Sequence, residues 1–176
     1  MAVSSLAFAQ NSVSSDIHIA KGKKVSRNIS TVSGDVFVGS GARIKGGVTA
    51  VSGDIEIGSK AFVQNVEVVS GNISIGKGAS AAQLETVSGD IHLYEKSGVS
   101  RSIETVSGDV NCDSGSDITK NIITVSGDIE LDDSRLRGDL KTVSGDISLF
   151  NGSMIDGDII INRKSNVVLF HDGKLK

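Results

Sequence analysis

The chain has no proline and no tryptophan, and its 176 residues include only one cysteine, one tyrosine and five phenylalanines. A single cysteine excludes an internal disulfide bond. Because aromatic residues are so scarce, a hydrophobic core must be built from valine, isoleucine and leucine, which favours stacked β-strands. No apolar run approaches the roughly 20 residues that a membrane-spanning helix requires, so we expect no membrane insertion.

The charge of the chain is also small. A net charge of -3 and 38% hydrophobic residues predict one folded domain and not a disordered chain. This mild acidity gives no general attraction to nucleic acid, so we expect no nucleic-acid partner. Basic residues are scattered except near the C-terminus, where Arg163, Lys164, Lys174 and Lys176 lie close together in the sequence.

The first ten residues, MAVSSLAFAQ, differ from the rest of the chain. Ala7, Phe8 and Ala9 before Gln10 form the small-x-small pattern of a secretory cleavage site, and an apolar run precedes them. A basic region before that run is missing. We interpret residues 1–10 as the remnant of a signal peptide and predict an exported protein, periplasmic or extracellular. The alternatives are a capping strand at this end and a cytoplasmic location.

The sequence Val-Ser-Gly-Asp, or a close variant, recurs at intervals of 18 or 19 residues. Ser15 replaces the glycine of the first copy, and Asn72 replaces the aspartate of the fourth. The copies end at Asp16, Asp35, Asp54, Asn72, Asp90, Asp109, Asp128 and Asp146. An apolar, a polar and an apolar residue then follow, as in Ile91, His92 and Leu93, which predicts a short strand with one buried face.

Two further columns of branched residues recur in each repeat, near Ile44 and Val48 in the second copy. Three short strands in 18 or 19 residues indicate a triangular, single-stranded parallel β-helix of about eight coils and roughly 40 Å. We assign residues 11–161 to these repeats and residues 162–176 to a degenerate last coil that caps the C-terminal end. The variable repeat length favours a right-handed helix, and a left-handed hexapeptide-type helix is the alternative.

The corner residues have a predicted structural role. Glycines such as Gly89 are expected to need a positive φ or a place without a Cβ atom. The corner Asp and Ser side chains are expected to accept unpaired backbone N–H groups, and the preceding valine to point inward. Calcium is the alternative reading of the aspartates, but Ile44, Val63 and Val99 stand where calcium-binding β-rolls need a second aspartate. We therefore predict no metal and no cofactor.

The segment from Gly53 to Ala79, GDIEIGSKAFVQNVEVVSGNISIGKGA, resembles two families. One is the bactofilins, which are polymer-forming bacterial cytoskeletal proteins, and the other is the bacterial adhesin-type β-strand-repeat domains. Both resemblances imply a right-handed β-helix over nearly the whole chain after Asn11. Bactofilins are cytoplasmic and lack a cleavable signal, so the pattern at residues 7–10 makes the adhesin-type resemblance the better fit.

No cluster of polar residues predicts catalysis. His18 and His92 fall in one outward column but four coils apart, about 20 Å, and His171 stands alone; each is interpreted as a surface histidine. Cys112 occupies an inward column and is expected to be a small buried hydrophobe. We predict no catalytic and no cofactor-binding residue. A polysaccharide-active enzyme is the third alternative, although such β-helices carry longer loops.

Two pairs of carboxylates fall in corners, Asp132 with Asp133 and Asp156 with Asp158, and are interpreted as turn residues. The Arg-Gly-Asp tripeptide at residues 137–139 matches an integrin-binding motif. Because Gly-Asp recurs in this repeat anyway, chance is the better explanation of that match.

Taken together, these patterns predict a non-enzymatic, exported β-solenoid that acts as a structural or adhesive module of the bacterial envelope. Its expected partners are a cell-surface or cell-wall polymer bound through the flat polar faces, or further copies of the chain added end to end at exposed strand edges. The alternative is a self-polymerising filament protein of the bactofilin type.

Overall fold

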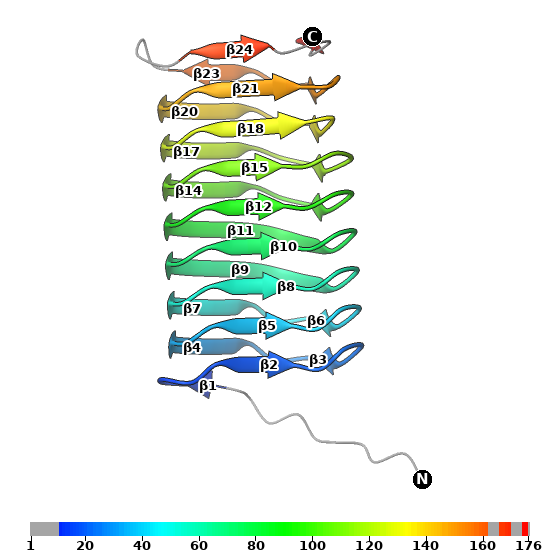
Figure 1. Ribbon diagram of the computed structural model, residues 1–176, viewed down its shortest axis with the longest axis vertical. Coiled ribbons are helices and arrows are strands. Elements are labelled where there is room, and N and C mark those ends of the chain that lie inside the picture. The colour runs from blue at the N-terminus through cyan, green and yellow to red at the C-terminus, as the bar shows by residue number, and fades with distance from the viewer. Residues whose placement is uncertain (1–10, 162–165, 170–173, 176) are drawn as a thin grey trace.

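The computed structural model describes residues 11–161, 166–169 and 174–175, and every regular element in these residues is a β-strand. Figure 1 shows a rod of stacked strands with β1 (Asn11–Ser12) at one end and β24 (Val167–Leu169) near the other. The predicted all-β solenoid is confirmed. Residues 1–10, with the predicted signal remnant, lie outside the described residues, as does much of the predicted cap at 162–176.

The first face of the rod is a nine-stranded parallel sheet that begins directly after the Asp or Asn of each corner. Its strands are β2 (Ile17–Ile19), β5 (Val36–Val38), β8 (Ile55–Ile57), β10 (Ile73–Ile75), β12 (Ile91–Leu93), β15 (Val110–Cys112), β18 (Ile129–Asp132), β21 (Ile147–Phe150) and β24. Ile73 pairs with Ile55 on one side and with Ile91 on the other. Equivalent residues of successive repeats therefore lie in neighbouring layers, as the spacing predicts.

The second and third faces share one 16-stranded sheet, because β9 (Phe62–Ser70) and β11 (Ser80–Ser88) run through the corner between them. The second face contains the starts of these two strands together with β3 (Lys24–Val25), β6 (Arg43–Ile44), β13 (Gly98–Val99), β16 (Asp117–Ile118), β19 (Arg135–Leu136), β22 (Met154–Ile155) and β25 (Lys174–Leu175). The third face contains their ends together with β1, β4 (Ile29–Ser33), β7 (Val48–Ser52), β14 (Ile103–Ser107), β17 (Ile122–Ser126), β20 (Leu140–Ser144) and β23 (Ile159–Ile161).

The coil is right-handed. In Figure 1 the chain rises from β1 toward β24 while the strands in front, such as β8 and β10, run from left to right and those behind, such as β9, run from right to left. Parallel strands of one sheet are almost always connected in this sense. The left-handed alternative is therefore wrong.

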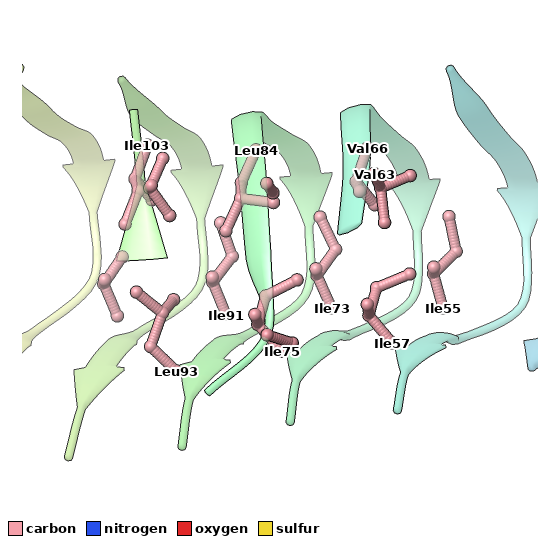
Figure 2. Close-up of a cluster of buried hydrophobic side chains, with 14 of the residues drawn as sticks. Ile55, Ile57, Val63, Val66, Ile73, Ile75, Leu84, Ile91, Leu93 and Ile103 are labelled. Atoms are coloured by element: carbon pink, nitrogen blue, oxygen red, sulfur yellow. The ribbon is translucent and has the colours of Figure 1, made fainter. Parts of the chain in front are cut away.

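Branched aliphatic side chains fill the interior of the prism. Figure 2 shows side chains of all three faces meeting there, from Ile55, Ile57, Val63, Val66, Ile73, Ile75, Leu84, Ile91, Leu93 and Ile103. All of these side chains are fully buried, and no aromatic residue joins the core in the described residues. Burial of one such side chain contributes about 1.5–3 kcal/mol, and each strand also pairs with its equivalents in the neighbouring coils, as Ile73 does with Ile55 and Ile91.

Coils of 18 residues lack one residue at a corner and not within a face. Two residues separate the second and third faces in the coil of residues 54–71, whereas three separate them in the coil of residues 35–53. The coil of residues 128–145 is shortened instead at the corner between the first and second faces. Leu136 therefore comes one residue earlier in its repeat than Ile118 does, but the two residues still pair. Register within the faces is therefore independent of repeat length.

The valine before each corner serine faces the solvent, so the expectation that it points inward is wrong. Side chains alternate along β4, where Ile29 and Thr31 are buried and Val32 is 48% exposed. The strand continues to Ser33, so the period of two still governs the valine. The exposed column consists of Val32, Val51, Val69, Val87, Val106, Val125 and Val143, each 43–50% exposed.

Candidate functional site

Each corner carboxylate joins its coil to the next one. The Oδ1 atom of Asp90 accepts a hydrogen bond from the backbone N–H of Asp109 at 2.9 Å, and Asn72 Oδ1 accepts one from the N–H of Asp90 at 2.8 Å. The same bond has Asp16, Asp35, Asp54, Asp109, Asp128 and Asp146 as acceptors. The predicted pairing of corner amides with aspartates is confirmed. Corner serines such as Ser88 make no side-chain hydrogen bond in the described residues, so that part of the expectation is wrong.

The corner glycines stack directly on one another. Gly89 has a φ of +146°, and a Cβ atom there would lie 2.0 Å from the carbonyl oxygen of Gly71. Both predicted reasons for glycine therefore apply together, the positive φ and the lack of space. Ser15 holds the glycine place of the first coil, where no corner lies beneath it among the described residues.

The corner aspartates have few free oxygen atoms that could bind a cation. The Oδ1 atom of each ladder aspartate already accepts a backbone amide, as Asp54 does from Asn72 at 2.7 Å. Within residues 11–161 and the two short described segments after them, no group of three or more His, Cys, Asp and Glu residues is placed to hold a metal ion. The absence of calcium binding stays a prediction, because only a titration can test it.

The histidines lie apart, as the column spacing indicates. His18 on β2 stacks on Phe37 with ring centroids 4.8 Å apart, and His92 on β12 stacks on Tyr94 at 4.2 Å. His92 Nε2 also contacts Asp113 Oδ1 at 3.0 Å, a pair that sequence reasoning missed. The pair stands on an open face, and no nucleophile is hydrogen-bonded to it in the described residues. His171 lies outside the described residues.

Cys112 is buried on β15, 2% exposed, as its column predicts. Burial raises the pKa of its thiol far above the ordinary value, and the nearby Asp113 adds to that shift. The thiolate that would act as a nucleophile or metal ligand is therefore strongly disfavoured.

The corner carboxylate pairs are engaged in structure. Asp133 accepts a hydrogen bond from the Ser114 hydroxyl at 2.7 Å, and Asp156 accepts one from the Arg135 guanidinium at 2.6 Å. Arg137 of the Arg-Gly-Asp tripeptide forms a bidentate pair with Asp117, whose pKa is lowered mainly by this hydrogen bond. The arginine of the tripeptide is therefore engaged in an ion pair on the surface of the rod, where its side chain is 48% exposed.

A shallow groove of about 400 Å³ runs along the third face beside the exposed valines. Its outward lining residues are Thr49, Glu67, Val69, Glu85, Val87, Glu104, Val106, Ile123 and Val125. We call this region the acidic valine groove. Sequence reasoning missed it, because the valines were assigned to the core and the glutamates were not read as one column.

Glu67, Glu85 and Glu104 occupy adjacent rungs in this groove. Burial raises the pKa of Glu85, and the negative charges of Glu67 and Glu104 raise it further, although a hydrogen bond from the Gln83 side chain opposes the shift. None of the three carboxylates forms an ion pair with a cation among the described residues. The groove therefore carries uncompensated negative charge next to an apolar column.

Positive charge gathers elsewhere, on the second face and its two corners in the first three coils. The exposed cations there are Lys21, Lys24, Arg27, Arg43, Lys45 and Lys60. We call this set the N-terminal basic surface. No acidic residue shares this part of the surface, and none of the six cations forms an ion pair within the described part of the chain.

Stacked parallel coils with rows of like side chains define a β-solenoid repeat protein. Residues 61–175, well over half of the chain, match the family model described as Toastrack DUF4097, and the chain belongs to this family. The searches of curated proteins and of solved structures give no match. No helix in the described residues is long and apolar enough to cross a membrane.

Proposed function

We propose that this Toastrack protein is a non-enzymatic structural or adhesive module of the bacterial envelope. The observation that supports this proposal most is the arrangement of its outward side chains, which form open rows along three flat faces. The groups that could perform chemistry are spread along these rows or engaged in the corner ladder. Enzymes need such groups to converge in a hollow.

Rows of repeated side chains suit a repetitive ligand. Many weak contacts made in parallel give a strong overall attachment when both partners repeat along their length. A glycan or a cell-wall polymer has that property. The adhesin-type resemblance of the segment from Gly53 to Ala79 supports the same proposal.

End-to-end polymerisation, the bactofilin-type alternative, has one structural observation in its favour. The strands of the first coil, β2 and β3, each pair with only one neighbour among the described residues, β5 and β6 respectively. Their other edges have no strand partner in residues 11–161, 166–169 and 174–175, and an exposed strand edge can add a strand of another chain. Electron microscopy of the purified protein tests this alternative, because filaments one rod wide would support it.

Export rests on the sequence pattern at residues 7–10. We expect the protein in the periplasmic or extracellular fraction, with a mature N-terminus at Gln10 in mass spectrometry. Replacement of Ala9 by tyrosine should block cleavage, whereas Ala9→Ser should leave it unchanged because serine is small. Recovery of the uncleaved chain from the cytoplasm alone would contradict the proposal.

Binding is tested separately with isolated cell walls. We expect the purified full chain to sediment with the walls and to be released by soluble wall fragments. A chain that stays in the supernatant at every protein and salt concentration would refute an adhesive role.

A further inference from the structure

We propose that the N-terminal basic surface of one molecule docks on the acidic valine groove of a second copy, so that rods associate side by side. The inference goes beyond the proposed function, because it defines both halves of a contact and does not depend on where the protein resides. It also differs from end-to-end addition, since it uses the sides of the rod and not its edges.

Complementary charge is the first argument. Glu67, Glu85 and Glu104 lie on three successive rungs and have no cationic partner among the residues that the structure describes, and the charges of Glu67 and Glu104 raise the pKa of Glu85. Lys24 and Arg43 likewise lie on successive rungs of the second face without an anionic partner in the described residues. Contact between the two surfaces would neutralise both sets of charge.

The spacing of these charges favours a second solenoid over an extended peptide. Neighbouring strands lie about 4.8 Å apart, so the three groove glutamates repeat at that interval, as do Lys24 and Arg43, whose column continues with Phe62. An extended peptide presents side chains on one face about 6.6 Å apart, and its third cation would be displaced by about 4 Å from the third carboxylate. Two rods with aligned axes keep Lys24 and Arg43 in step with two successive glutamates of the groove.

Apolar contact adds to the charges. Phe62 lies next to Arg43 on the second face and points outward, half-buried. The aliphatic stems of lysine and arginine also cover apolar surface while their charged ends reach an acceptor. Phe62 and these stems are therefore able to cover valines such as Val87 while the cations meet the glutamates.

Two copies of the same surface would repel each other. A groove facing a groove brings carboxylates together, and a basic surface facing its copy brings cations together. Only the unlike pairing is favourable, and such a heterologous contact leaves one surface of each kind free to bind further copies. The result would be an open-ended lateral array.

The size of the contact predicts weak association. The basic surface limits the contact: it spans three coils, about 14 Å, and a five-residue strand spans about 16 Å, which gives about 230 Å² of face. Stable complexes bury about 800 Å² on each partner. We therefore expect association that needs high protein concentration and that salt suppresses, because exposed charges are screened.

The test is sedimentation equilibrium of the full chain over a wide range of protein concentration. At about 20 mM salt the average mass should at least double from the 18.2 kDa monomer, and at about 500 mM salt it should return to that value. The variant E67K/E85K/E104K has two basic surfaces, and the variant K24E/R43E/K45E has two acidic ones. Each should stay monomeric alone, and an equal mixture should associate.

A matched control changes glutamates of the first face, Glu56→Lys with Glu130→Lys, and should associate like the unmodified chain. Circular dichroism verifies that each variant is folded. Mass that stays at 18.2 kDa for the unmodified chain in low salt would overturn the proposal. So would charge-reversed variants that associate alone, or a mixture that stays monomeric.

Discussion

Replacement of Asp90 tests whether the corner side chains hold the coils together by geometry or by charge. Asp90→Ala removes the Oδ1 acceptor of the Asp109 N–H, a bond of 2.9 Å. The bond from the N–H of residue 90 to Asn72 uses the backbone, so alanine keeps it. Asp90→Asn keeps the oxygen acceptor and removes only the negative charge, and Asn72 already has this chemistry in the native chain.

The structure gives the magnitude. A hydrogen bond to a charged group contributes about 1.5–3 kcal/mol, and the corner is exposed, so the low end applies. Loss of the charge relieves at most about 1 kcal/mol of repulsion from Asp109. We expect Asp90→Ala to lower the free energy of unfolding by about 1–2 kcal/mol and Tm by about 2–8 °C. Asp90→Asn should stay within about 0.5 kcal/mol of the native chain.

Urea unfolding followed by circular dichroism, with calorimetry for Tm, measures these differences. Equal destabilisation by alanine and asparagine would refute the geometric account, because the charge would then be the required property. A large rise of Tm in millimolar calcium would point the same way, toward a bound cation.

Three further outcomes follow from the structure. Gly89→Ala should cost several kcal/mol in urea unfolding because its Cβ would lie 2.0 Å from a carbonyl oxygen, whereas Gly41→Ala, with a φ of +68° and open space, should cost about 1–2 kcal/mol; equal losses would argue against stacked corners. A thiol reagent should modify Cys112 only after denaturation, and rapid labelling of the folded chain would contradict its burial. The pKa of Glu85 is higher in the folded state than in the unfolded state. The protonated carboxyl therefore stabilises the fold at a pH below the unfolded-state pKa, and this stabilisation is lost as the pH rises through the folded-state pKa. Glu85→Gln should therefore raise Tm at about pH 7 and change it little at about pH 3, and a fall at neutral pH would show that the carboxylate stabilises the groove.

The repeat predicts the fold because stacking turns every local preference into a column. Ile73 lies between Ile55 and Ile91 because one repeat of the sequence makes one coil. The spacing of the repeats alone therefore predicts which residues pair in neighbouring strands. The aspartate ladder was also predictable, since a tight corner leaves amides unpaired and a short acceptor side chain can reach them.

The surface was less predictable. Val32 was placed inside because valine is usually buried, but strand alternation overrides residue type and turns it outward. The acidic and basic surfaces escaped notice because residues far apart in sequence, such as Lys24 and Arg43, become neighbours only when coils are stacked. The His92–Asp113 contact depends on side-chain conformations that spacing does not specify.

The same side-chain-to-backbone hydrogen bond joins each coil to the next at the corner. A complete coil could therefore be removed, and the two coils that then meet would form the same bond. Excision of residues 90–108 would join Gly89 to Asp109, and Asn72 Oδ1 would then accept a hydrogen bond from the backbone N–H of Asp109. Such a molecule would be shorter by about 4.8 Å. The length of the rod is thus set by the number of repeats in the gene. Duplication or loss of one repeat would lengthen or shorten the rod by one coil.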